Sequence, residues 1–489
     1  MRHPLRSIAV QGAWYAAGSA LVKVSGLILL PVLTNTRFLS VADYGFWGVL
    51  EVSAQIAVAT LGLALSVGLV RFYNEPWGGD RALAATWWMT AGIAGLIAVV
   101  GGVAVARFAP VALRPVYAWL LVHTAGELLL AVPLAYLRAR ERALVHTLVQ
   151  GLKLALLVSI ALVLMVRHAQ GLAGLTRALG ISTGATLVIA VLWSKHPAFF
   201  GRALCGGPLF DRTLAVRLLK FSVPLVLGGL GSMVLNAGDR YVLAGLRPPE
   251  DLAYYSLASR FGGVVNMLAV QPLNLAWMPL LFRLREDQRP GVLRLLVPYL
   301  AIALCAAVIV ISIFAAPVLH IMSSDPVYAE RAVPLIPWVG FGFAAFGLAV
   351  VTTGVLALFH RTRIVSLCIL LVAALNIALN FALVPRFGPA GSAVATLVSY
   401  LALDIAHFRL IASLVPNRYP WGRIFGVAAV SAAAAFAGAL RPYTGGVTDW
   451  CFRGGLLAAW AAALLVTRWF TIGEMREIVR VMRGPMSRP

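Results

Sequence analysis

Charged side chains interrupt the long apolar stretches of this sequence at a few positions. The run NAGDRYVLAGL, for example, places Asp239 beside Arg240 among uncharged residues. An ionisable side chain inside a membrane costs about 2.5–3.5 kcal/mol on insertion scales, so such side chains usually face a polar interior. Arg and Lys in that setting bind phosphate-like anions, and His or a buried carboxyl group carries protons. The sequence therefore indicates anion binding or proton transfer.

Three polar residues share one face of the first apolar stretch. Tyr15, Ser19 and Lys23 follow one another at intervals of four residues, which places them on one side of a helix. Lys23 lies about 11 residues into the stretch, or about 16 Å at the rise of an α-helix, near the middle of a bilayer. We expect this face to line a water-filled cavity. The alternative is that the Lys23 side chain extends to the membrane interface.

A second group of charged residues lies in the middle of the chain. Asn236 and Arg240 are also four residues apart, and Arg260 lies at a similar depth in the next apolar stretch. We expect these three side chains to contact a bound anion. Asp239, and Glu51 at the matching depth in the first half, are candidates for binding a coupling ion or for pairing with these cations. The alternative is a structural salt bridge, such as Asp239 with Arg260, that only joins two helices.

Two further pairs combine a carboxyl group with an imidazole. His123 and Glu127 are four residues apart and Asp404 and His407 are three apart, so each pair shares a helix face. Either pair is suited to proton transfer, and either serves equally well as a hydrogen-bonded packing pair. The four cysteines show no paired spacing, and no metal or cofactor site is predicted.

The elements that must hold these residues are membrane helices. The chain has 489 residues, of which 61% are hydrophobic and 12% charged, and its mean hydropathy is +0.89. Soluble domains are about 45–50% apolar and about 25% charged, and a membrane span needs about 20 apolar residues. We therefore predict an all-α polytopic membrane protein with about 14 transmembrane helices. The predicted spans are 12–36, 43–72, 82–106, 115–137, 143–166, 172–194, 217–246, 252–282, 292–321, 332–359, 364–385, 389–414, 422–440 and 453–471.

The basic residues indicate the topology. A net charge of +22 suggests nucleic acid as a partner in a soluble protein, but membrane proteins collect Lys and Arg in their cytoplasmic loops. Most of the 40 basic residues fall on the side that both termini share. We therefore predict cytoplasmic termini and no nucleic-acid binding. Arg453 falls on the opposite side, at the start of the last predicted span.

The longest gap between spans, about 195–216, suggests a division of the chain. We expect a first lobe in residues 1–205, a second in 206–415, and two further helices with a basic tail in 416–489. An internal repeat supports the two lobes: LSVADYGFWGVLE (39–51) aligns with RPPEDLAYYSLAS (247–259) at an offset of 247 − 39 = 208 residues. Each segment has an acid near a helix start and then interfacial aromatics. The alternative is two similar helix starts at a membrane surface.

Three segments carry a resemblance to a known family. GAWYAAGSALVKVSGLILLPVLTNTRFLSVADYGFWGVLE (12–51) resembles the opening of the polysaccharide transporter family, with its glycines, Lys23, Pro31 and ADYG. LKFSVPLVLGGLGSMVLNAGDRYVLAGL (219–246) resembles the start of that family's second half, and GPAGSAVATLVSY (388–400) resembles the start of a late core helix. These proteins are the oligosaccharide-lipid (O-antigen, Wzx-type) flippases of the multidrug/oligosaccharidyl-lipid/polysaccharide (MOP) exporter superfamily. The resemblance extends to about residue 415.

The resemblance implies two six-helix lobes arranged in a V around a central cavity. It also implies that an undecaprenyl-pyrophosphate-linked oligosaccharide or polysaccharide repeat unit crosses the bacterial inner membrane, with a proton or sodium gradient as the proposed driving force. Membrane lipids, a polysaccharide polymerase and the chain-length machinery are the implied partners. One alternative is a cation-coupled multidrug exporter of the same superfamily, which would be expected to have an acidic cavity. Another is an integral-membrane glycan polymerase or ligase, but the predicted outer loops are short for a catalytic site.

Overall fold

The structure, a computed structural model, is helical throughout the part of the chain that it describes. Two compact units divide the chain, Met1–Met233 and Val234–Pro489, and each is described by itself below. The described residues are 26–194, 211–274, 289–414 and 419–471, with Trp14, Gly18, His196, Phe199, Trp277, Leu281, Gly473, Glu474 and Arg476. Within these ranges every regular element is a helix.

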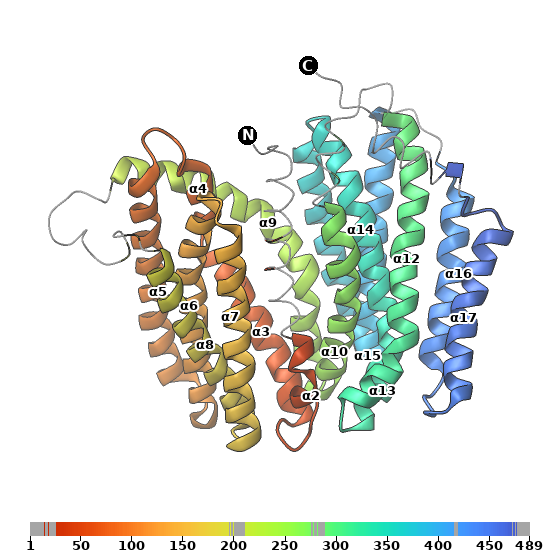
Figure 1. Cartoon of the computed structure of the whole chain (residues 1–489), viewed down its shortest axis with the longest axis horizontal. Helices are drawn as coiled ribbons and strands as arrows, with labels where there is room; N and C mark the ends of the chain where they lie inside the picture. Colours follow the sequence, from red (N-terminus) through yellow and green to blue (C-terminus); the bar gives the residue numbers. More distant parts are fainter. Residues whose placement is uncertain are drawn as a thin grey trace. The chain divides into compact units, whose positions relative to one another are not determined.

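The N-terminal unit is a bundle in which α6 packs against α5 and α8, and α8 packs against α7 (Figure 1). The hydroxyl of Ser40 caps α3 by accepting a hydrogen bond from the backbone N–H of Asp43 at 3.0 Å. Left-handed backbone at Leu63 and Ala64 separates α3 from α4, and the two helices bend by 43°. The helices are α2 (Leu30–Leu33), α3 (Val41–Leu61), α4 (Leu65–Phe72), α5 (Gly79–Phe108), η1 (Val111–Leu113), α6 (Arg114–Ala139), α7 (Ala143–Ala161), η2 (Leu162–Arg167) and α8 (Gly171–Ser194).

The C-terminal unit holds the remaining helices, and α9 runs into it from the N-terminal unit. Here α14 packs along α15, and α12 packs along α16 (Figure 1). Glu250 and Asp251 lie in the first turn of α10, as Asp43 does in α3. The helices are α9 (Arg212–Leu246), α10 (Pro249–Val265), η5 (Asn266–Val270), α12 (Arg289–Met322), α13 (Pro326–Ala332), η6 (Val333–Leu335), α14 (Ile336–Leu358), α15 (Thr362–Leu414), α16 (Trp421–Leu440) and α17 (Val447–Val466).

The long helix α15 is two helices that meet at Gly388. Its backbone there has φ 56° and ψ −135°, between Pro385 and Pro389. A glycine suits this position because φ is positive. A Cβ would also lie 3.3 Å from the Arg247 guanidinium group, which is a tight contact. The break agrees with the two spans expected at 364–385 and 389–414.

The predicted fold class is confirmed. Within the described ranges, nine helices are long and apolar enough to cross a membrane, or up to eleven if each bent pair is one span. The protein is therefore a multi-pass membrane protein. The count of 14 spans, the V shape and the lobe boundaries at 205 and 415 stay predictions, and about half of the first expected span (12–36) lies outside the described residues.

The last span differs from its prediction. α17 covers Val447–Val466 rather than 453–471, so Arg453 lies inside the helix and not in a loop. Both Arg453 and Asp449, one turn before it, are fully buried, and the Arg453 Nε lies 2.8 Å from the Asp449 Oδ2. The prediction considered each charged residue separately and therefore placed Arg453 in water. The ion pair between Arg453 and Asp449 allows both residues to be buried.

Candidate functional site

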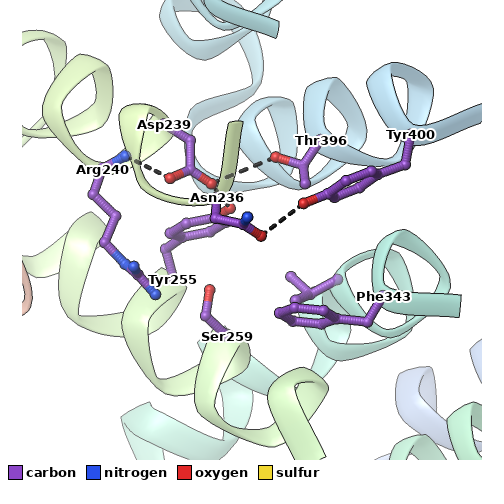
Figure 2. A pocket seen from close by; sticks show the side chains of 9 residues that line it. Asn236, Asp239, Arg240, Tyr255, Ser259, Phe343, Thr396 and Tyr400 are labelled. Atoms are coloured by element: carbon purple, nitrogen blue, oxygen red, sulfur yellow. Dashed lines mark hydrogen bonds between the residues drawn. The ribbon is translucent and has the colours of Figure 1, made fainter. Parts of the chain in front are cut away.

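A pocket opens between four helices of the C-terminal unit (Figure 2). Its empty volume is about 350 Å³, which includes space open to the surroundings. Each of the four helices, α9, α10, α14 and α15, contributes side chains to its wall. The lining residues are Asn236, Asp239, Arg240, Tyr255, Ser259, Val339, Phe343, Thr396 and Tyr400.

Asp239 is the buried acid of this pocket, with 4% of its surface exposed. Its carboxylate accepts hydrogen bonds from the hydroxyl of Tyr255 on α10 and from the hydroxyl of Thr396 on α15, the latter at 3.4 Å. The backbone N–H of Arg240 donates a third bond at 2.8 Å. A buried carboxylate needs such donors because desolvation otherwise disfavours its charge. Asp239 therefore joins α9, α10 and α15.

The Arg240 side chain behaves differently from its neighbour. Figure 2 shows it extending away from the Asp239 carboxylate toward the side of the pocket where Ser259 lies. The residue is half-buried, and its guanidinium group makes no ion pair with any residue in the described part of the chain. The Asn236 carboxamide, one turn earlier on the same face, accepts a hydrogen bond from the Tyr400 hydroxyl at 2.7 Å. The pocket thus presents a guanidinium group whose donors are uncommitted.

Two asparagines of α15 support the wall of the pocket from behind. Asn376 and Asn380 are both fully buried, and they are joined by a 3.2 Å hydrogen bond between their side chains. Asn376 donates to the hydroxyl of Ser399 at 3.3 Å, and the hydroxyl of Ser392 donates to Asn380 at 2.8 Å. These bonds tie the first half of α15 to its second half and fix the position of Thr396.

The N-terminal unit contains a second polar cluster, whose charged residues are half-buried. Glu127 pairs with Lys153 and accepts a hydrogen bond from the hydroxyl of Thr183 at 3.0 Å. His123 Nδ1 lies 2.9 Å from the same hydroxyl and 3.8 Å from the Glu127 carboxylate. Because the hydroxyl donates its only proton to Glu127, it accepts from His123. A Cβ on Gly126 would lie 2.9 Å from Thr183, so this glycine lets α8 approach α6.

Asp404 and His407 lie on α15, deeper in the C-terminal unit. Asp404 is 5% exposed and His407 is fully buried. His407 Nδ1 contacts the hydroxyl of Thr352 on α14 at 3.0 Å. Neither oxygen of Asp404, and not Nε2 of His407, has a hydrogen-bond partner among the described residues.

Comparison with known families decides the family of the chain. The family described as polysaccharide biosynthesis protein matches residues 9–285, which is more than half of the 489 residues. The chain belongs to this family. No curated protein sequence matches the chain.

Several solved structures of transporters share the fold of this chain. Lipid II flippase MurJ, in an inward closed conformation, superposes with a TM-score of 0.73 at 12% identity, over 92% of this chain and 98% of that chain. A MATE family multidrug resistance transporter in an inward-facing conformation gives 0.62 at 15%, over 83% and 95%. A MOP superfamily transporter from Pyrococcus furiosus gives 0.51 at 12%, over 83% and 96%. The expected family is confirmed by the family match, and the superpositions show that the chain shares the fold of these transporters.

The structure brings together part of the predicted site. Asn236, Asp239 and Arg240 line one pocket, and Arg260 follows the pocket residue Ser259 and is half-buried. Asp239 contacts Tyr255 and Thr396 rather than Arg260. Glu51 is half-buried in α3 of the N-terminal unit, and its expected role in binding a coupling ion or in pairing with the cations stays a prediction. Tyr15, Ser19 and Lys23, which were predicted to line the cavity, lie outside the described residues.

Sequence reasoning missed the uncharged partners of the predicted charges. Tyr255, Thr396 and Tyr400 hold Asp239 and Asn236 in place, and Thr183 holds Glu127. A usable signal existed in GSAVATLVSY, where Ser392, Thr396 and Tyr400 recur every four residues. No cluster of three or more His, Cys, Asp or Glu suited to a metal ion occurs where the structure places residues.

Proposed function

We propose that this protein translocates a polyprenyl-pyrophosphate-linked oligosaccharide or polysaccharide repeat unit across the bacterial inner membrane by alternating access. The family match and the shared fold with a lipid II flippase support a transporter of lipid-linked glycans. The observation that carries the anionic headgroup is the uncommitted Arg240 guanidinium group in the pocket of the C-terminal unit. A planar guanidinium group binds phosphate oxygens in pairs.

Lys23 is proposed as a second contact for the pyrophosphate, with Tyr15, Ser19 and Arg260 along the path of the glycan. Asp239 is proposed as the ion-coupling acid, since it is the buried carboxylate of the pocket and its donors come from three helices. Movement of any one of these helices removes a donor and changes the affinity of the carboxylate for a cation. The termini are proposed to be cytoplasmic, and a polymerase and chain-length proteins to receive the glycan.

Deletion of the gene and complementation with variants test this function. Without the protein, we expect a lipid-linked glycan to accumulate on the cytoplasmic face of the membrane. Arg240→Ala removes charge-assisted hydrogen bonds of about 1.5–3 kcal/mol, so we expect about a 10- to 150-fold loss of glycan export at limiting expression. Arg240→Lys keeps the positive charge but lacks the paired donors of the guanidinium group, so we expect its glycan export to lie between those of the wild type and Arg240→Ala. Arg409→Ala removes an exposed arginine of α15 and serves as the matched control.

Three results would contradict the proposal. The flippase hypothesis is refuted if no glycan accumulates and sensitivity to cationic drugs rises instead. That result is expected if the protein is a multidrug exporter. The cationic pocket fails if Arg240→Ala and Lys23→Ala both export normally at equal protein levels. The proposed topology fails if cysteines placed in the two termini react with a membrane-impermeant reagent from the periplasmic side.

A further inference from the structure

The second half of α15 carries a line of polar side chains through the C-terminal unit. Ser392, Thr396, Tyr400, Asp404 and His407 are spaced by four, four, four and three residues, so they share one face of the helix. Four of the five are buried, and Thr396 is partly buried. The line extends over 15 residues, about 22 Å at the rise of an α-helix. Such a line inside an apolar unit demands an explanation.

The first three members of the line belong to the pocket and its wall. Ser392 bonds to Asn380, Thr396 bonds to Asp239, and Tyr400 bonds to Asn236. Their hydrogen-bonding capacity is therefore used, and hydroxyl groups in such an arrangement both donate and accept. This part of the line connects the pocket to the interior of the unit.

The last two members are not accounted for by packing. Asp404 follows Tyr400 by one turn, and neither of its oxygens has a hydrogen-bond partner among the residues that the structure describes. Asp404 is 5% exposed, and Leu403, which precedes it in the chain, belongs to a buried apolar cluster with Ala345 and Ala349 of α14. An ionised carboxylate without donors is far less stable in such surroundings than a neutral carboxylic acid. This position therefore favours the neutral acid over the carboxylate.

His407 offers the complementary group. The hydroxyl of Thr352 donates to the backbone carbonyls of Leu348 and Ala349, so toward the imidazole it acts as an acceptor. His407 Nδ1 then carries the proton, and Nε2 carries a lone pair that is buried and has no partner in the described ranges. Two unpartnered groups, one acidic and one basic, thus lie three residues apart on one helix face.

No charged group on the neighbouring helices explains the pair as a salt bridge. α14, which packs along α15, contains no titratable side chain. The acid also cannot serve a metal ion well, because metal ions take several oxygen ligands and the surroundings are apolar. A proton needs one. Titratable groups do occur on the other elements near this part of α15. They are Asp239, Arg240 and Tyr241 on α9, Glu250, Asp251, Tyr254, Tyr255 and Arg260 on α10, Cys368, Tyr400, His407 and Arg409 on α15 itself, and Tyr419 before α16.

We propose that Asp404 and His407 form a proton-binding site in the C-terminal unit, separate from Asp239, which exchanges its proton with the pocket along the polar face of α15. In the loading step a hydronium ion gives a proton to the Asp404 carboxylate, so that one O–H bond breaks, one forms, and water leaves. During exchange a bridging water molecule accepts the proton of the acid as it gives one of its own protons to His407 Nε2, and the reverse transfer restores the acid, which then returns its proton to water on the side of the pocket; three unpartnered polar atoms are present to hold this water. The site rests on the proposed function only in that its proton drives the transport.

The loaded and empty states require different packing of α15. The neutral acid is compatible with the dry contact between α14 and α15, whereas the carboxylate requires water or a donor. Loss of the proton therefore favours opening of this contact, and Thr352 transmits the change from His407 to α14. A proton taken up on one side of the membrane thereby biases the conformation of the unit.

Infrared spectroscopy of the full-length protein in lipid vesicles tests the site without any glycan. We expect a carbonyl stretching band of a protonated carboxyl group in the wild type, its absence in Asp404→Asn, and its retention in Asp251→Asn. Asp251 is a suitable control because it is ion-paired with Arg247 at 2.7 Å at the start of α10. In D2O the band should shift within seconds, and His407→Gln should slow that exchange by about 100-fold.

Two spectroscopic outcomes overturn the proposal. If the wild type lacks the band, Asp404 is ionised and the site does not hold a proton as described. If the band is present but does not shift in D2O over hours, Asp404 is a sealed structural acid. Asp404→Asn has the shape of the neutral acid, so misfolding is not expected, and His407→Gln provides an independent variant.

Complementation separates this site from the proposed substrate. We expect Asp404→Asn to flatten the pH dependence of glycan export, whereas a wild-type pH profile in this variant overturns the coupling. If Arg240→Ala and Lys23→Ala both export glycan normally while the Asp404 band exchanges as expected, the cationic pocket is refuted and the proton site stands. If Arg240→Ala blocks export and the Asp404 band does not shift in D2O, the cationic pocket stands and the proton site is overturned.

Discussion

Replacement of Arg453 by methionine should destabilise the C-terminal unit by removing one side of a buried ion pair. The Arg453 and Asp449 side chains are both fully buried, with Nε and Oδ2 2.8 Å apart. A second nitrogen of Arg453 donates to the backbone carbonyl of Ile313 on α12 and, at 3.2 Å, to that of Gly438 on α16. The arginine thus ties α17 to both helices. Methionine fills much of the same volume without the charge.

The charge, not the lost hydrogen bonds, should dominate the effect. Breaking a buried pair costs about 3–5 kcal/mol because the remaining charge has no compensation. Hydrogen bonds between membrane helices average about 0.6 kcal/mol each in double-mutant cycles. Arg441 compensates Asp449 poorly, because its Nε lies 3.8 Å away and its side chain is 39% exposed. We therefore expect Arg453→Met to lower the free energy of unfolding by about 3–5 kcal/mol.

The double variant decides between the two causes. With Asp449→Asn added, no buried charge is left over, and we expect the loss to shrink to about 1 kcal/mol, close to the two lost hydrogen bonds. Equilibrium unfolding in detergent micelles measures these values, and Arg409→Met at an exposed position controls for removal of a charge. The reasoning is refuted if the single variant loses less than about 1 kcal/mol, or if the double variant is as unstable as the single one.

Three further predictions follow from other contacts. Gly438→Ala places a Cβ 2.6 Å from a side chain of α12 and should cost about 1–3 kcal/mol of unfolding free energy, whereas Gly422→Ala on the same helix meets open space and should cost nothing. Lys153→Met leaves Glu127 half-buried without its cation and should lower the melting temperature, with recovery on adding Glu127→Gln. Partial burial opposes ionisation of Glu474, but hydrogen bonds from a tyrosine, an arginine and a threonine outweigh it and lower the pKa below its ordinary value of 4.5. The ionised form therefore stabilises the attachment of the segment after α17, and this stabilisation is lost as the pH falls through the lowered pKa; proteolysis of that segment against pH should show the loss, and Glu474→Gln should abolish the pH dependence.

Hydropathy alone predicts most of the helices because burial in lipid is a local property of each stretch. α6 at Arg114–Ala139 and α8 at Gly171–Ser194 lie within two residues of their expected ends. The wrong placement of Arg453 shows the limit of hydropathy, which assigns each charged residue to water and takes no account of an oppositely charged partner. Asp449 stands four residues earlier, and that spacing would have allowed the pair to be predicted.

The candidate site was predictable only for its charges. Asp239 and Arg240 stand out because charge is costly in a membrane. Thr396 and Tyr400 are 157 and 164 residues away from the side chains that they bond, and hydroxyl groups on membrane helices carry no such cost. Which hydroxyl meets which carboxylate depends on the rotation of α15 against α9, which no local pattern determines.

These partners change the meaning of the adjacent charges in NAGDRYVLAGL. As a bare pair, Asp239 and Arg240 would neutralise each other and offer a ligand nothing. Tyr255 and Thr396 hold the Asp239 carboxylate in the wall of the pocket, where it is 4% exposed, while the Arg240 guanidinium group is half-buried and extends toward Ser259. A ligand entering this pocket therefore meets a cation first. A cationic drug would be repelled there, whereas a pyrophosphate would be held, and this asymmetry favours the lipid-linked glycan over the multidrug substrate.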